Sequence, residues 1–153
     1  MPGTIEAGEQ LYELTLRTTS MEDFGVSMAA IGGGQAVPPE GARIDAYVEG
    51  ECTGKISGAV KVVDYLLIRP DGRIQLHIHG SIETPDGARI SFSATGTGRN
   101  DPSTGLLHIR ENIELHSSAP EYAWVNTISA WGTGGSDEKG VLTIKVYAAD
   151  PGA

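Results

Sequence analysis

Two carboxylates stand at positions where the alternation of the chain predicts apolar side chains. Asp64 falls on the apolar face of its predicted strand, and Glu111 does the same in a later strand. A carboxylate in an apolar interior needs hydrogen bonds or a raised pKa. A carboxyl group with a raised pKa can serve as a general acid or base near neutral pH. We therefore take Asp64 and Glu111 as candidate catalytic groups. The alternative is a structural acid, bonded to backbone or to an arginine, or turned outward by a bulge.

A second group of side chains offers a wall for an organic ligand. Tyr122, Trp124 and Asn126 alternate along residues 122–131, which we predict to be a strand, so they share one face. Aromatic rings supply contact area, and a phenol or an amide can orient a substrate oxygen. We expect Tyr122 to belong to the catalytic set and Asn126 to the binding set. A core layer of aromatic rings is the alternative. The other expected substrate-binding residues are Leu66, Ile78, Phe92 and Trp124.

His77 and His79, separated by one residue, form the sequence pattern that most resembles a metal-binding motif. Both imidazoles share a strand face with Glu83, and with His108 further on they loosely resemble the cupin metal motifs. The spacings depart from those motifs, and these histidines fall on the polar face of their strands. We therefore predict no metal and no cofactor, and a metal-dependent cupin-like protein is the alternative.

Eight strand-like runs separated by turn signals must position these residues. Turns such as Pro85-Asp86-Gly87 preset one backbone angle with proline and permit a positive φ at glycine. A meander of eight strands leaves two edges, which closure removes. We predict an all-β fold, a closed antiparallel β-barrel of about eight strands forming a single domain over residues 1–153. The expected strands are Gln10–Thr18, Arg43–Thr53, Ala59–Arg69, Arg73–Thr84, Arg89–Thr97, Gly105–His116, Tyr122–Trp131 and Val141–Ala148.

The segment 20–41 stands apart from this pattern. It is too long for an ordinary connection, and its glycine and proline clusters predict irregular structure. We expect a lid or an interface arm here.

Composition restricts the partners of the chain. Its 153 residues carry a net charge of −9, which disfavours nucleic acid and anionic membranes as partners. The single cysteine, Cys52, rules out an intrachain disulfide and fits a reducing compartment. The N-terminal residues show no signal-peptide pattern, so we expect a cytoplasmic location. We also expect a homo-oligomer.

Several motifs resemble the uncharacterised family called domain of unknown function 3237. The stretches 64–72 and 84–90 and the triplet Gly96-Thr97-Gly98 carry the resemblance, and Glu121-Tyr122-Ala123-Trp124-Val125-Asn126 resembles that family's Tyr-x-Trp-Leu-Asn box. The resemblance covers about residues 45–148. It implies a lipocalin-like barrel similar to that of allene oxide cyclase and no established activity. It marks Asp64, Tyr122, Trp124 and Asn126. The family's Arg-Tyr pair in the fourth strand is replaced here by His79 and Gly80, which removes a hydroxyl.

Small side chains on the inward face predict space for a ligand. Our functional hypothesis is a cofactor-independent acid–base enzyme, an isomerase, cyclase, lyase or hydratase, acting on a small hydrophobic molecule that contains oxygen. A non-catalytic module that binds such a molecule is the other reading of the same pocket. The small inward residues are Ala46, Gly50, Cys52, Gly80, Ala94 and Gly96.

Overall fold

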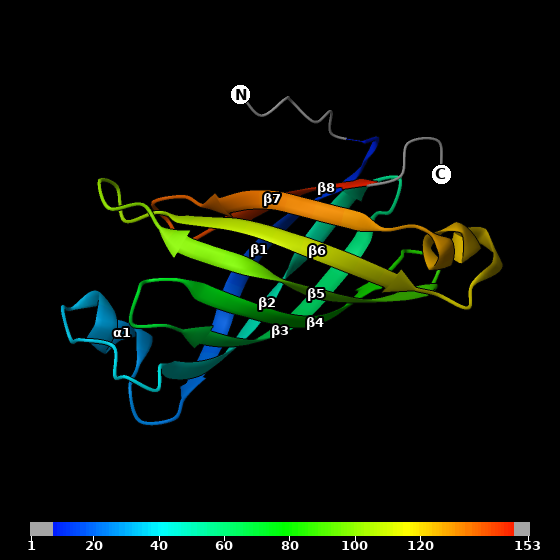
Figure 1. Ribbon diagram of the computed structural model, residues 1–153. Coiled ribbons are helices and arrows are strands. Elements are labelled where there is room, and N and C mark those ends of the chain that lie inside the picture. Colours follow the sequence, from blue (N-terminus) through cyan, green and yellow to red (C-terminus); the bar gives the residue numbers. More distant parts are fainter. Residues whose placement is uncertain (1–7, 149–153) are drawn as a thin grey trace.

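The computed structural model describes residues 8–148 as one closed barrel of eight antiparallel strands (Figure 1). Each strand pairs with its neighbours in sequence, and β1 closes the barrel by pairing with β8. The predicted fold class is therefore confirmed. The strands are β1 (Gln10–Asp23), β2 (Ala42–Gly54), β3 (Gly58–Ile68), β4 (Ile74–Glu83), β5 (Arg89–Asn100), β6 (Leu107–His116), β7 (Ala130–Ser136) and β8 (Leu142–Ala148).

Alternation of side chains decides which face of each strand is inside. In β4, Ile74, Leu76 and Ile78 are buried, and the intervening Gln75 and His77 are exposed. The same two-residue period runs through β6. Burial of the apolar face against the opposite wall supplies the main favourable free energy of the fold. The inward apolar side chains of these two strands are thus the ones that the sequence predicts.

Short turns between β3 and β4 and between β4 and β5 fix the register of the barrel. Gly72 and Gly87 have φ values of 89° and 88°, in the left-handed region that glycine tolerates. In the first turn, the Asp71 carboxylate accepts a hydrogen bond from the backbone N–H of Arg73 at 3.1 Å. These are the turns that the two Pro-Asp-Gly sequences predict.

The segment that follows β1 differs from its expected form. Residues up to Asp23 belong to β1, which extends beyond the expected end at Thr18 because the chain keeps pairing with β2 after a register shift. A short helix, α1 (Met28–Gly32), follows, and the side chain of Ser27 caps its first turn. The apolar side chains of Val26, Met28, Ile31 and Val37 are partly buried against the core, whereas that of Phe24 is exposed.

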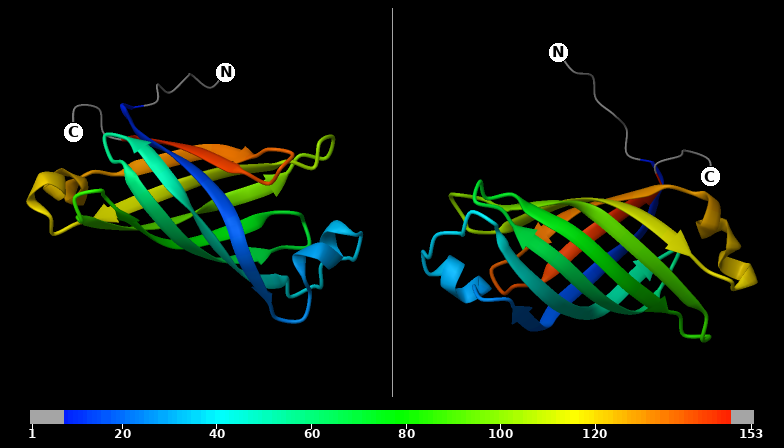
Figure 2. Two further views of the ribbon diagram at one scale, coloured as in Figure 1. Left: turned by 180° about the vertical axis from the view of Figure 1, so that it is seen from behind. Right: turned by 60° about the horizontal axis from the view of Figure 1, so that its bottom comes forward.

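The expected strand at residues 122–131 is wrong. Pro120–Thr127 form a 3₁₀ helix, η1, with a proline in its first turn, and β7 begins only at Ala130. Helices α1 and η1 lie at opposite ends of the barrel (Figures 1 and 2). Within residues 8–148, neither helix is long and apolar enough to cross a membrane.

Candidate functional site

The barrel interior contains two polar side chains that lack hydrogen-bond partners. Glu111 on β6 is 5% exposed and Tyr12 on β1 is 1% exposed. Neither Glu111 Oε2 nor Tyr12 Oη has a hydrogen bond within the described residues 8–148. A buried polar atom without a partner costs about 1–3 kcal/mol, so such atoms call for a physical explanation. Two of them in one interior indicate a place where a polar ligand atom would be favourable.

Electrostatics connect these two groups with Asp64. Burial, together with the negative charge of Asp64, raises the pKa of Glu111 to about 7. Burial also raises the pKa of the Tyr12 phenol, and the charge of Glu111 adds to that effect. At neutral pH the Tyr12 hydroxyl therefore keeps its proton, while the Glu111 carboxyl group is divided between its two protonation states.

Asp64 lies at an opening in the β3–β4 pairing. Paired residues pass directly from Asp64–Ile78 to Leu67–Gln75, and the Asp64 carboxylate accepts a hydrogen bond from the backbone N–H of His77 at 3.0 Å. Burial raises the pKa of Asp64 to about 6, although this hydrogen bond lowers it. The half-buried group is thus bonded to backbone, as the structural alternative proposed, and it also titrates near neutral pH.

Gly132 on β7 makes room for the Glu111 side chain. The two residues are paired across β6 and β7. A Cβ atom at position 132 would lie 3.1 Å from Cγ and from Oε1 of Glu111, and also 3.1 Å from Ile144 Cγ2. Glycine here lets the carboxylate turn into the barrel rather than being pressed away by its neighbour.

The apolar candidates from the sequence, Leu66, Ile78 and Phe92, all point inward and are buried. A Cβ at Gly80 would lie 2.3 Å from Cζ of Phe92, so the Phe92 ring already fills the space beside this glycine. The tyrosine that the family resemblance implies at position 80 has no room here. The ring of Phe92, from the next strand, thus occupies the place where the family's tyrosine side chain would begin.

Two other small residues do not leave the space that the sequence predicts. A Cβ at Gly50 would lie 1.9 Å from the carbonyl oxygen of Thr15, and one at Gly96 would lie 2.1 Å from that of Arg110. These glycines permit neighbouring backbones to approach closely where the strands coil. The expectation of open volume at Gly50, Gly80 and Gly96 is corrected accordingly.

The aromatic group around residue 124 lies on η1 at one end of the barrel instead of lining a strand face. Tyr122 and Trp124 are partly buried against the core from η1. The Asn126 side chain bonds both backbone groups of Ser117, accepting from its N–H and donating to its carbonyl, each at 2.8 Å. Asn126 therefore fastens η1 to the end of β6. These three residues are at a different place from the interior acids.

His77 and His79 project from the outer face of β4. Their rings lie 5.2 Å apart, and each lies about 6 Å from the ring of Tyr65. Within the described part of the chain, no group of three or more His, Cys, Asp and Glu side chains could hold a metal ion.

Tyr12 is the interior polar residue that the sequence reasoning missed. It precedes Leu14 and Leu16 at two-residue spacing, so its inward direction was readable from the same alternation. Its phenol does not stand out in the sequence because a tyrosine fits an apolar pattern, whereas a carboxylate breaks one.

The family model described as "Protein of unknown function (DUF3237)" matches residues 23–149. The chain belongs to this family. No protein with a curated functional description matches the sequence. The family name leaves the activity open, so it adds no chemistry to the interior groups.

Solved structures share the barrel of this DUF3237 chain at low identity. A β-barrel-like protein from Acinetobacter baumannii is 18% identical with a TM-score of 0.75, covering 97% of this chain and 98% of that one. A conserved protein of unknown function from Rhodopseudomonas palustris is 22% identical with a TM-score of 0.73, covering 96% and 99%. An enzyme from Penicillium herquei is 19% identical with a TM-score of 0.63, covering 97% and 98%. These likenesses show the fold.

Proposed function

We propose that the protein is a cofactor-independent acid–base enzyme that acts on a small hydrophobic molecule carrying one or two oxygen atoms. The observation that carries the proposal is the pair of unpartnered buried atoms, Glu111 Oε2 and Tyr12 Oη. The likeness of the barrel to an enzyme from Penicillium herquei supports the proposal at the level of the fold.

The chemistry follows from the protonation states of the three groups. With a pKa of about 7, Glu111 exchanges a proton with substrate in either direction at neutral pH. Tyr12, held neutral, donates a hydrogen bond to a carbonyl, epoxide or enolate oxygen. Asp64, with a pKa of about 6, bears a negative charge that adds to the effect of burial on the Glu111 pKa. Proton transfer beside a stabilised oxygen is the common step of isomerases, cyclases, lyases and hydratases.

The apolar body of the substrate would pack against Leu66 and Ile78, and it would displace the ring of Phe92 from the space beside Gly80.

Deuterium exchange tests the chemistry without a known substrate. Cyclohexanone in D₂O loses its α-hydrogens when an acid–base pair acts on the ketone, and the loss is followed by ¹H NMR. We expect the wild-type protein to accelerate this exchange and Glu111→Gln to remove most of the acceleration, on the order of 10²-fold. Glu114→Gln, on the exposed face of the same strand, is the matched control.

Binding is measured in the same samples through the methyl resonances of Leu66 and Ile78. Saturable shifts with no exchange would replace the enzyme by a non-catalytic binding module. Absence of both shifts and exchange, across a panel of ketones, epoxides and enones, would overturn the proposal.

A further inference from the structure

The outer wall of the barrel carries a groove lined by unpaired arginines. The groove has a volume of about 960 Å³ and runs between the β3–β4 turn and the β5–β6 loop. Arg73, Arg99 and Arg110 all line it, together with His108 and Asn100. Three of the eleven basic side chains of an acidic protein thus meet at one place.

Strand register explains why these arginines meet. Thr97 pairs with Arg110 and Arg99 pairs with His108 across β5 and β6, so the two arginines stand two positions apart on the same outer face. Arg73 directly precedes Ile74, which pairs with Gly98 next to Arg99. All three side chains belong to exposed residues.

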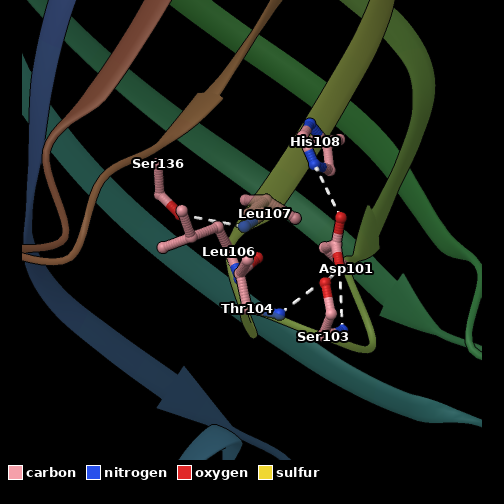
Figure 3. A network of polar contacts seen from close by, with 7 residues as sticks. All are labelled: Asp101, Ser103, Thr104, Leu106, Leu107, His108 and Ser136. Atoms are coloured by element: carbon pink, nitrogen blue, oxygen red, sulfur yellow. Dashed lines mark hydrogen bonds and ion pairs between the residues drawn. The ribbon is translucent and has the colours of Figure 1, made fainter.

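Two carboxylates at the edge of the groove, Asp71 and Asp101, already bond to residues of their own turns. Asp71 forms an ion pair with Arg69 at 2.6 Å. Asp101 accepts hydrogen bonds from the backbone N–H and the hydroxyl of Ser103 at 2.8 and 2.6 Å, and it lies 3.6 Å from His108 (Figure 3). These bonds hold the pKa of Asp101 at about 2, so it remains charged and fixes the loop.

The three groove arginines have no such acidic partner. Within residues 8–148, none of them forms an ion pair, and the one hydrogen bond of the Arg110 side chain goes to the carbonyl of Ile109 at 2.9 Å. Guanidinium groups that converge without a carboxylate are suited to bind a phosphate or carboxylate through paired N–H donors.

A second, adjoining hollow extends this groove toward an aromatic surface. It has a volume of about 550 Å³, shares Arg73, Thr97 and Arg110 with the first, and reaches Trp131. The Trp131 ring is stacked on Tyr147 with 5.0 Å between ring centroids. The arginines at one end could bind an anionic group, and the Trp131 indole at the other end could stack on a planar ring. The two hollows together therefore suit a ligand with an anionic head and a planar body.

We propose that this groove binds a small phosphate monoester attached to a planar organic group, with the phosphate on Arg73, Arg99 and Arg110 and the ring near Trp131. The net charge of −9 favours a compact dianion over a nucleic acid, since a long polyanion would meet the acidic remainder of the surface. The arginine groove is on the outer wall, and the adjoining hollow also borders Glu111 and Gly132.

The test uses phenyl phosphate as the probe and the full-length ¹⁵N-labelled protein at pH 7.5 in low salt. Saturable shifts are expected at the backbone amides of Thr97 and Arg99 and at the Trp131 indole N–H. Arg99→Gln combined with Arg110→Gln should weaken binding at least about tenfold, because charge-assisted hydrogen bonds are lost. The control pair, Arg17→Gln with Arg89→Gln, makes the same charge change elsewhere and should leave affinity within about twofold.

Three results would overturn parts of this assignment. Equal affinities in the groove and control variants would remove the arginine site. Equal affinities for inorganic phosphate and phenyl phosphate would remove the role of Trp131. Tighter binding of a 20-nucleotide single strand than of phenyl phosphate would replace the small ester by nucleic acid. Unchanged amide spectra of the variants outside the groove establish that the barrel is intact.

Discussion

The ring of Phe92 on β5 occupies the space directly beside Gly80 on β4, its paired neighbour. This close packing predicts that a larger side chain at position 80 destabilises the protein. Gly80→Ala places a methyl group 2.3 Å from the original position of Phe92 Cζ, so the ring must move within a packed interior. We expect a loss of about 1–3 kcal/mol in the free energy of unfolding, as for overpacked cores. Urea unfolding followed by circular dichroism measures it.

The rescue of this variant is equally specific. Phe92→Leu removes the clashing ring edge, so adding it to Gly80→Ala should cost less than the sum of the two single changes. Gly32→Ala is the control, because a Cβ at Gly32 meets no atom within 4 Å. Strict additivity of the two changes would contradict the proposed contact.

The raised pKa of Glu111 predicts a pH-dependent stability. Its carboxyl group has a pKa of about 7 in the folded protein and about 4.5 when unfolded, so the folded state holds the proton more tightly between these values. Its contribution to stability is full below pH 4.5 and is lost as pH rises through 7, by on the order of 3 kcal/mol. The free energy of unfolding of Glu111→Gln should therefore increase relative to that of wild type as pH rises from 4.5 to 8.

Unfolding free energies of the two proteins at pH 4.5, 6 and 8 provide the measurement. Glu114→Gln, whose side chain is exposed on β6, should follow the wild-type curve. A constant difference between Glu111→Gln and wild type across the range would mean that Glu111 titrates normally.

The hydrogen bond of Asp64 predicts a local effect on β4. Asn at position 64 retains an oxygen acceptor for the His77 N–H, whereas Ala does not. Hydrogen exchange of the His77 amide should be faster in Asp64→Ala and remain slow in Asp64→Asn. Equal exchange in both variants would show that another group protects this amide.

Asn126 is expected to stabilise the attachment of η1 to the end of β6. Asn126→Ala leaves the N–H and the carbonyl of Ser117 without their side-chain partner, which should cost about 1–3 kcal/mol. Asn112→Ala on the exposed face of β6 is the control. A stability equal to wild type, combined with impaired ligand binding, would instead assign Asn126 to a binding site.

Cys52 offers a reporter of unfolding. The thiol is 2% exposed, and burial raises its pKa to about 11. An aromatic disulfide reagent at pH 8 should react with it only when the chain unfolds, because the thiolate is the nucleophile. Rapid labelling of the folded protein would show that this part of β2 opens locally.

Alternation of side chains carried most of the fold prediction. The buried residues of β4 and β6 follow a strict two-residue period, which includes Glu111 on β6, whereas Asp64 on β3 is only partly buried. The same rule failed at residues 122–131, where aromatic and β-branched side chains resemble a strand. Pro120 and the bonds from Asn126 to Ser117 instead favour a helix across the barrel end.

The parts of the interior that the sequence could not predict depend on pairing between strands. That Phe92 fills the space of Gly80 follows from the β4–β5 register, and that Gly132 admits Glu111 follows from the β6–β7 register. Neither pairing is visible in the local sequence. The convergence of Arg73, Arg99 and Arg110 on one groove has the same origin.

The strand order has a consequence for how the chain folds. Seven of the eight strand pairs join consecutive strands, but β1 must wait for β8 to complete the barrel. During synthesis, β1 therefore exposes an unpaired edge until nearly the whole chain has left the ribosome, and exposed edges invite pairing with other chains. The residues of β1 that pair with β8, from Gln10 to Leu16, are thus where another nascent copy would most readily add.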